Sequence, residues 1–108
     1  MGDAAWKAFE RRVAKDFGGK RRGPDTGGAR GGKTDIIHPL FAVECKLLSR
    51  IGGADVLNAA IQAETNAEDS QLPIAVLKKK RASMNDAVVA MRYQTFIEWF
   101  VSLEEGEN

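Results

Sequence analysis

The stretch that decides the fold is TDIIHPLFAVECKLL, residues 34–48, in which two apolar-rich segments flank a Pro-Leu pair. Isoleucine, valine and phenylalanine favour extended backbone, so we expect strands at 35–38 and 41–47. The short separation of these segments predicts that they pair as an antiparallel hairpin. Because Pro-Leu is not a common tight-turn sequence, the register of the hairpin rests on counting outward from residues 39–40.

A hairpin with this register would place three charged side chains on one face of the sheet. It sets Ile36 opposite Val43 and Asp35 opposite Glu44, and opposed residues hold their Cβ atoms about 5 Å apart. Because strand residues alternate between the two faces, Lys46 shares the face of Glu44. Ile36 and Val43 would then point the other way, into a core.

Two carboxylates and a lysine in this arrangement suit phosphodiester hydrolysis, which needs a cation and an activated water. Asp35 and Glu44 provide the oxygen ligands that Mg²⁺ prefers, and Mn²⁺ is expected to substitute. Lys46 can orient or deprotonate a water, or steady a phosphate. The alternative is an ion pair on a sheet face, which Glu-x-Lys alone usually is. The strand around Glu44 and Lys46 is apolar, and unpaired charge in such a strand is costly. This context favours a metal site over a plain ion pair.

The other segments predict an α/β fold with the order α-β-β-β-α-β-β-α, a mixed sheet flanked by helices. Residues 4–17 carry an apolar stripe at helical spacing, with Asp3 as a candidate N-cap and Gly18-Gly19 as a stop. The remaining expected elements are a helix at 55–69 capped by Asp55, strands at 73–77 and 87–93, a strand near 20–22 that we do not place, and a final helix opened by a Thr95–Glu98 capping box.

Length and composition bound the class of protein. A chain of 108 residues with 44% hydrophobic and 29% charged residues is typical of one small globular domain, which we place at 1–108. No apolar run approaches the roughly 20 residues that span a bilayer, and the N-terminus lacks a signal-peptide core, so we expect no membrane partner. The single cysteine, Cys45, excludes an internal disulfide. An intracellular protein is the plain expectation.

Charge is unevenly distributed along the chain, although its sum is only +1. Residues 1–34 hold nine Lys or Arg and four Asp or Glu, a balance of +5, whereas residues 35–77 hold two and six, a balance of −4. Basic segments attract phosphate backbones, and clustered carboxylates attract hard cations. A simple DNA-coating protein needs only the first feature, whereas a nuclease needs both.

A glycine-rich basic segment at residues 18–33 admits two interpretations. It contains seven of the eleven glycines and five Lys or Arg, which is typical of a solvated loop and also of a loop that follows a nucleic-acid backbone. Gly27–Thr34, GGARGGKT, also fits the phosphate-loop pattern GxxxxGK[ST]. That motif needs a buried strand before it and a helix after it. Neither is expected here, so a nucleotide hydrolase that uses Lys33 is a minor alternative.

Asp35, eight intervening residues and Glu44-Cys45-Lys46 resemble the motif of the PD-(D/E)xK nuclease superfamily. The helix AFERRVAKDF and the basic loop after it look like the start of archaeal-type Holliday-junction resolvases, although Thr34 stands where the motif has proline. The resemblance implies a restriction-endonuclease-like fold, Mg²⁺-dependent DNA hydrolysis, and a symmetric homodimer that presents two sites to a four-way junction. A nuclease this short would suit a phage or mobile element acting in the host cytoplasm.

The resemblance also implies a role for each site residue. Asp35 and Glu44 would hold the metal together with the backbone carbonyl of Cys45, whose side chain alternates away from the site and is expected in the core. Lys46 would be the catalytic lysine. Glu10 would correspond to the helical carboxylate and act on the metal directly or through water.

Basic side chains outside the site are the expected contacts to DNA phosphates, with salt-sensitive binding and little base specificity. Arg11 and Arg12 could equally belong to a solvated helix face. For residues 78–81, a second contact to the DNA backbone is favoured over a solubilising loop. Gln62 loosely matches a glutamine of related nucleases, although a polar surface residue is the simpler interpretation. The candidate contacts are Arg11, Arg12, Lys20, Arg21, Arg22, Arg30, Lys33, Lys78, Lys79, Lys80 and Arg81.

Two further functional alternatives stay open. Another nuclease of the same superfamily would share the site but cut linear or single-stranded DNA. A non-catalytic nucleic-acid-binding module would leave Glu44 and Lys46 as an ion pair. The apolar stripe of the final helix is expected in the core or, in part, at a dimer interface. It comprises Phe96, Trp99, Phe100 and Leu103.

Overall fold

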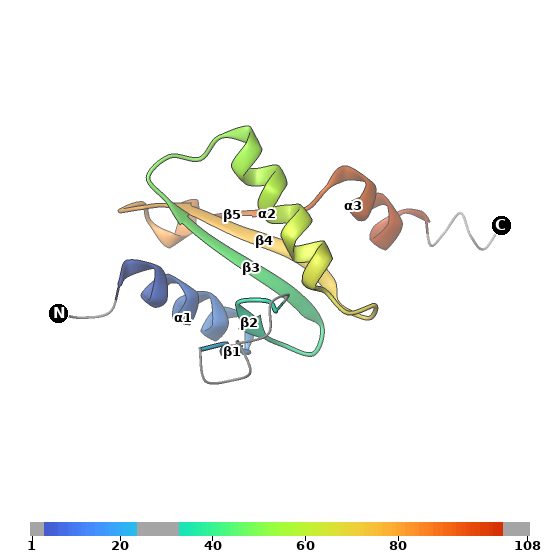
Figure 1. Ribbon diagram of the computed structural model, residues 1–108, viewed down its shortest axis with the longest axis horizontal. Helices are drawn as coiled ribbons and strands as arrows, with labels where there is room; N and C mark the ends of the chain where they lie inside the picture. The colour runs from blue at the N-terminus through green and yellow to red at the C-terminus, as the bar shows by residue number, and fades with distance from the viewer. Residues whose placement is uncertain (1–3, 24–32, 103–108) are drawn as a thin grey trace.

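The structure is a computed structural model, and it describes residues 4–23 and 33–102 of the chain (Figure 1). Its helices are α1 (Ala5–Phe17), α2 (Gly53–Asn66) and α3 (Tyr93–Phe100), with a 3-10 turn at Met84–Asp86. Its strands are β1 (Lys20–Arg21), β2 (Ile36–Ile37), β3 (Phe41–Leu48), β4 (Leu72–Lys79) and β5 (Val88–Ala90). The predicted α/β class and the order α-β-β-β-α-β-β-α are confirmed.

All five described strands belong to one mixed sheet with the order β1-β2-β3-β4-β5. β3 and β4 run parallel and are joined through α2, whereas the other neighbouring pairs are antiparallel. A parallel pair needs such a crossover, because a tight turn can only reverse the chain. The long strands β3 and β4 therefore form the centre of the sheet, with the short strands at its edges.

The hairpin between β2 and β3 has the predicted register at the pair Ile36–Val43, and both residues are fully buried. The strand itself is shorter than predicted, since β2 covers only Ile36–Ile37. The turn is supported by His38, whose Nδ1 accepts a hydrogen bond of 3.0 Å from the Leu40 amide. The His38 side chain thus stabilises a turn that the Pro-Leu pair does not favour by itself.

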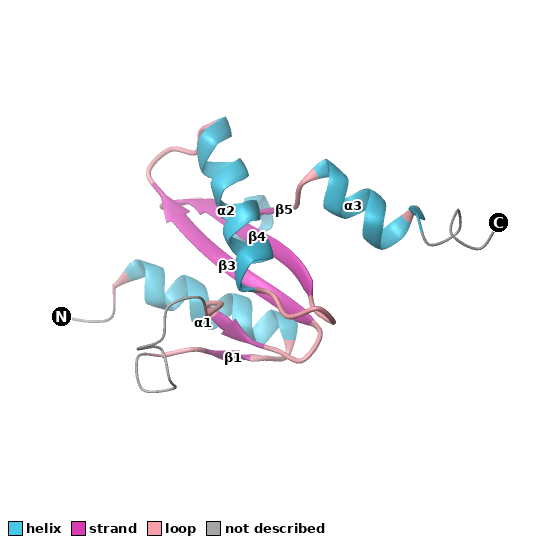
Figure 2. Cartoon of the chain, turned by 45° about the vertical axis from the view of Figure 1, so that its right-hand side comes forward, coloured by secondary structure: helices cyan, strands magenta, loops and turns pink. Residues whose placement is uncertain are grey.

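The helices α1 and α2 pack on opposite faces of the sheet, because neighbouring residues of β3 and β4 point in opposite directions. Figure 2 shows α2 in front of these strands and α1 behind β2. On the α1 side, Phe9 and Val13 pack with Val43 in the main core. On the α2 side, a smaller core sets Ala59 against Leu77. The edge of β3 lies between these two layers, within reach of both.

The starts of the first two helices differ from their predicted caps. α1 begins after Ala4, and the predicted cap, Asp3, lies outside the described residues. Gly18 ends this helix as predicted, with a φ of 75° that glycine adopts without strain. Asp55 is wrong as the cap of α2: it lies in the first turn, and its carboxylate accepts a hydrogen bond of 2.8 Å from the Gly52 amide.

The predicted Thr95–Glu98 capping box is also wrong, because α3 begins at Tyr93 and Thr95 lies inside it. Thr95 is buried, and its hydroxyl donates a hydrogen bond to Glu64 of α2. Glu64 also forms an ion pair of 2.8 Å with Arg92, just before α3. The Thr95 hydroxyl, which the sequence pattern assigned to a helix cap, therefore bonds to Glu64 of another helix.

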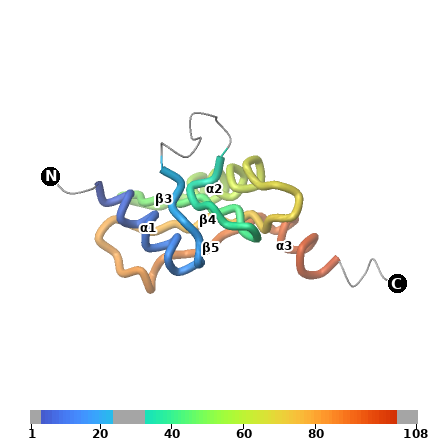
Figure 3. Tube along the Cα trace, turned by 90° about the horizontal axis from the view of Figure 1, so that it is seen from below, coloured from blue at the N-terminus to red at the C-terminus, as the bar shows by residue number. Residues whose placement is uncertain are grey.

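The apolar stripe of α3 faces outward for the most part. Phe96 is 47% exposed and Phe100 is 51% exposed, so the expectation that they belong to the core is wrong. Trp99 is half-buried, and Leu103 lies outside the described residues. Figure 3 shows α3 at the end of the molecule opposite α1, standing away from the sheet. Its described contacts with other elements are correspondingly few.

Candidate active site

The Asp35 carboxylate lies against the edge of β3, just before β2 begins. Its Oδ2 accepts a hydrogen bond of 2.8 Å from the Cys45 amide, and its own amide donates to the Val43 carbonyl at 3.1 Å. Thr34, before it, is buried and donates its hydroxyl to the Ile36 carbonyl at 2.9 Å. Asp35 is therefore held through both its backbone and its side chain. Its carboxylate takes the Cys45 amide, which has no backbone partner among the described residues because the pairing of β2 with β3 does not extend that far.

Glu44 is a buried carboxyl in the middle of β3, with only 1% of the residue exposed. Its Oε2 accepts a hydrogen bond of 3.1 Å from Asn66 Nδ2 of α2. Burial first and the neighbouring Asp35 second raise the pKa of Glu44 to about 7, against the opposing effects of Asn66 and Lys46. An ionised Glu44 is thus unfavourable in the folded protein, because it is desolvated next to like charge.

Lys46 follows Glu44 on the same face of β3, and its partner in β4 is Leu77 on the α2 side. It is partly exposed, and its charge lowers the pKa of Glu44. The side chain of Cys45 points the other way, into the main core, as predicted. Burial and then Asp35 raise the pKa of its thiol, which leaves it protonated at neutral pH.

Glu10 approaches the same edge of β3 from α1, on the other face of the sheet. Its side chain is 10% exposed and accepts a hydrogen bond of 2.7 Å from Arg21 of β1. Burial raises the pKa of Glu10, the Arg21 bond lowers it, and the charge on Asp35 raises it again. Arg21 also lies 5.3 Å from the centre of the Trp6 ring. Glu10 therefore has an ionic partner while staying within electrostatic reach of Asp35.

A pocket of about 490 Å³ opens beside Glu10 and Lys46, and neither Asp35 nor Glu44 is among the described residues that line it. Glu10, Cys45 and Lys46 line it, together with Trp6 and Lys80. The helix carboxyl and the strand lysine therefore share one space that water or a phosphate can enter.

The two adjacent carboxyls of Asp35 and Glu44 fit a small divalent cation. Within residues 4–23 and 33–102, no group of three or more His, Cys, Asp or Glu side chains is placed to hold a metal ion. Mg²⁺ needs fewer, since it commonly takes one or two carboxylates, keeps several waters and binds substrate phosphates. A further oxygen is available at the same edge, because the carbonyl of Cys45 points to the same side of the strand as its amide.

Asn66, near the end of α2, is a contact that the sequence analysis missed. Its Nδ2 donates to Glu44 and lies 3.4 Å from the Lys33 carbonyl, so it ties the site to the segment before β2. Its position at helical spacing after the buried Ala59 and Ala63 places it on the inner face of α2, which is the available signal. Gln62, by contrast, is exposed.

The predicted DNA contacts are spread over several elements. Arg22 donates a hydrogen bond of 2.7 Å to the Thr34 carbonyl, and Lys78 donates one of 2.8 Å to the Ala82 carbonyl, so these two also support the fold. By exposure the set divides into exposed Arg11, Arg12, Lys20, Lys33, Lys79, Lys80 and Arg81, half-buried Arg21, Arg22 and Lys78, and Arg30, which lies outside the described residues.

The phosphate-loop match lies largely outside the described residues, which resume at Lys33. The chain after Lys33 enters β2 and not a helix, and the Thr34 hydroxyl is engaged by the Ile36 carbonyl. Both facts disfavour a nucleotide-binding loop, which needs a following helix and a hydroxyl available to Mg²⁺.

Comparisons with known proteins yield no relative. No protein-family model matches the chain, and neither a curated protein nor a solved structure matches it. Among the described helices, none combines the length and the apolar character needed to cross a membrane. The function of the site is therefore argued from its chemistry.

Proposed function

We propose that the chain is a metal-dependent DNA endonuclease of the PD-(D/E)xK type with a restriction-endonuclease-like fold. The observation that carries the proposal is the Glu44 carboxyl, 1% exposed and adjacent to Asp35. Two neighbouring carboxyls in a desolvated place repel each other when both are ionised, which is unfavourable unless a proton or a cation compensates them. A plain ion pair between Glu44 and Lys46 would not explain why Asp35 lies beside them.

Asp35, Glu44 and the backbone carbonyl of Cys45 at the β3 edge would hold Mg²⁺, and Mn²⁺ should substitute. When bound, the cation stabilises the negative charge that develops on the phosphate during hydrolysis. The Nζ of Lys46 positions the attacking water and, when neutral, can accept its proton. Glu10 orients water from the α1 side while its Oε1 is held by Arg21.

The substrate that we propose is branched DNA, with four-way junctions first, held through its phosphates by the basic residues. A symmetric homodimer would present two sites to the two strands that are cut. Exposed Phe96 and Phe100 on α3, and exposed Val88 and Val89 on the edge strand β5, support self-association. An exposed edge strand and an outward apolar helix face are common sites of association between chains.

The test is a cleavage assay with Mg²⁺ or EDTA, comparing a labelled four-way junction with linear duplex of the same arm sequence. Asp35→Asn and Glu44→Gln should each slow cleavage by about 1,000-fold or more while keeping junction binding, because each neutralises a metal ligand without adding negative charge. The exposed acids Asp69 and Glu68 supply matched controls, Asp69→Asn and Glu68→Gln, which should cut normally.

Each outcome of the assay assigns a class. Paired, symmetric nicks in the junction alone would establish junction resolution. Equal cutting of both substrates would keep the nuclease and discard its junction preference. Metal-independent binding without cleavage would replace the enzyme with a binding module. Wild-type rates in Asp35→Asn or Glu44→Gln would show that the site lies elsewhere.

A further inference from the structure

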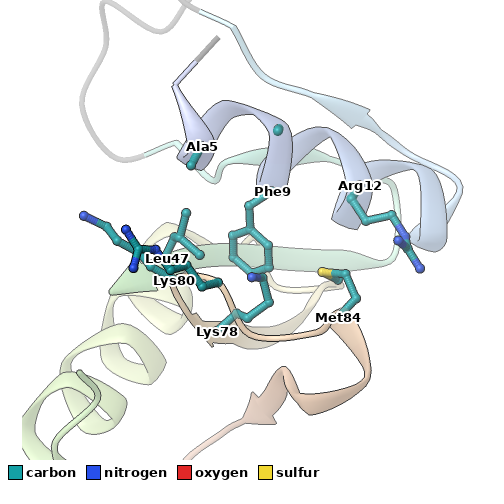
Figure 4. A pocket seen from close by; sticks show the side chains of 9 residues that line it. Ala5, Phe9, Arg12, Leu47, Lys78, Lys80 and Met84 are labelled. Carbon is teal, nitrogen blue, oxygen red and sulfur yellow. The ribbon is translucent and has the colours of Figure 1, made fainter. Parts of the chain in front are cut away.

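We propose that a second pocket, next to the candidate active site, binds one unpaired deoxynucleotide of the DNA strand that the site cuts. The inference rests on the proposed function and extends it to the form of the substrate. The pocket has a volume of about 410 Å³ and lies between α1, the end of β3, and the segment from the end of β4 to the 3-10 turn (Figure 4). Its size is in the range of pockets that hold small organic ligands.

The inner wall of this pocket is apolar. Phe9 belongs to the main core, and Leu47 and Met84 pack against that core from partly buried positions. Figure 4 shows the Phe9 ring directed into the space between Leu47 and Met84. Aromatic, aliphatic and thioether groups offer favourable contacts to the face or edge of a base. Such a wall makes no favourable contact with a charged phosphate, so it indicates that a base is the group bound there.

The rim of the pocket is cationic. Arg12, Lys78, Lys80 and Arg81 line it, and no carboxylate is among the described residues that do so. Arg12 is paired with Asp16 at 3.0 Å, so the three cations from the end of β4 onward supply most of the charge. Arg81 has a φ of 71°, a left-handed conformation that non-glycine residues seldom adopt and that is often found at functional sites. Cations around an apolar wall complement a ligand with a flat apolar group flanked by phosphates. A nucleotide within a strand has that chemistry.

The pocket adjoins the one beside Glu10 and Lys46, since Ala5, Leu47 and Lys80 line both. A strand that places one phosphate beside Lys46 can therefore set a neighbouring base against Leu47. Only a base that is not stacked and paired inside a duplex can occupy such a pocket. The pocket thus predicts DNA with an unpaired nucleotide next to the cut, as at a branch or a single-stranded end.

Binding is tested by fluorescence anisotropy in EDTA, so that cleavage plays no part. The probes are a short thymidine oligonucleotide and an abasic oligonucleotide of the same length, which carries the same phosphates. We expect the abasic probe to bind about tenfold more weakly. Met84→Gln should remove most of this difference, whereas Asn85→Gln, an exposed change in the same 3-10 turn, should preserve it. Thermal melting of both variants checks that they fold.

A second measurement uses the wild-type chain alone. A single strand containing 5-iodouracil is crosslinked by light, and the modified residue is found by mass spectrometry. Adducts on Phe9 or Met84 support the pocket. Equal affinity for the two probes, or adducts only at other residues, overturns it.

The two proposals fail separately. Cleavage with Mg²⁺ by a chain that binds both probes equally keeps the nuclease and rejects the nucleotide pocket. Base-dependent binding with adducts at Met84, but no cleavage of any DNA, keeps the pocket and rejects the nuclease.

Discussion

At the residue scale, Glu44 couples folding to pH. Burial and the adjacent Asp35 raise its pKa to about 7, above the ordinary value of 4.5. Between these pH values the folded protein keeps a proton on Glu44 that the unfolded chain has released, so stability falls as pH rises. The contribution of this proton is complete below pH 4.5 and is lost as pH passes through about 7.

Removing this carboxyl should therefore stabilise the metal-free protein at alkaline pH. We expect Glu44→Gln in EDTA to raise the free energy of unfolding by on the order of 2 kcal/mol at about pH 8, and to change it little at about pH 4. Urea denaturation at both pH values measures the difference. Glu68→Gln, an exposed change, is the control.

Mg²⁺ provides the complementary measurement for the same carboxyl. It should raise the melting temperature of the wild type at alkaline pH and leave that of Glu44→Gln nearly unchanged, because a cation that binds only the folded protein stabilises it. A Glu44→Gln variant that is less stable than the wild type in EDTA at about pH 8 would contradict the argument.

Asn66 acts on the site through Glu44 and is a positioning residue in the proposed reaction. Asn66→Ala removes the hydrogen bond that favours the ionised carboxylate, so the pKa of Glu44 should rise further. We expect the pH profile of Mg²⁺-dependent cleavage to shift to higher pH, with the rate at neutral pH reduced about 10- to 100-fold. Asn58→Ala, an exposed change on the same helix, should leave the profile in place. An unshifted profile in Asn66→Ala would make its contact with Glu44 merely structural.

At the element scale, α3 is attached to the fold by a small polar cluster. Glu64 of α2 accepts hydrogen bonds from Arg92 and Thr95, and these lower its pKa although burial acts in the opposite direction. A carboxyl with a lowered folded pKa stabilises the fold above its ordinary value of 4.5 and loses that effect as pH falls through the folded pKa. The attachment of α3 should therefore weaken in acid.

The measurement is amide hydrogen exchange of α3, corrected for intrinsic rates. Thr95→Val removes one donor of the cluster and should speed exchange in α3 about tenfold at neutral pH, with the central strands unaffected. Gln94→Ala, which removes an exposed hydrogen bond to Glu98 within α3, is the control. Unchanged protection of α3 in Thr95→Val would show that apolar packing, and not this cluster, holds the helix.

At the scale of the whole molecule, the sheet ends in an exposed edge strand, β5, followed by the outward face of α3. Tyr93, Phe96 and Phe100 recur at helical spacing, and the last two rings lie 5.1 Å apart. Such a surface suits a symmetric contact between two copies of the chain, as the proposed junction substrate requires.

Sedimentation measures this association. We expect the double change Phe96→Ser with Phe100→Ser to weaken the dimer by on the order of 100-fold and to convert paired junction nicks into single ones. Gln94→Ser, an exposed polar change on α3, should remain dimeric. A wild-type chain that sediments as a monomer at every concentration would refute the proposed dimer.

The sequence by itself determined the features that depend on local periodicity. Alternation along β3 separated Glu44 and Lys46 from Cys45, and counting from the turn found the pair Ile36–Val43. The order of helices and strands followed in the same way, since period-two and helical patterns are properties of a few neighbouring residues.

Only the tertiary structure decided which side chains meet across elements. Asn66 meets Glu44 because α2 packs on β3, and Thr95 turns from a predicted cap to Glu64 because the start of α3 lies beside α2. The outward face of α3 was decided in the same way. An apolar stripe at helical spacing indicates that a helix has an apolar face. Which surface covers that face depends on how all the other elements pack. Asn66 and Glu44 are 22 residues apart in the sequence, and Thr95 and Glu64 are 31 apart. Contacts between such distant residues depend on how the elements pack, which no local pattern encodes.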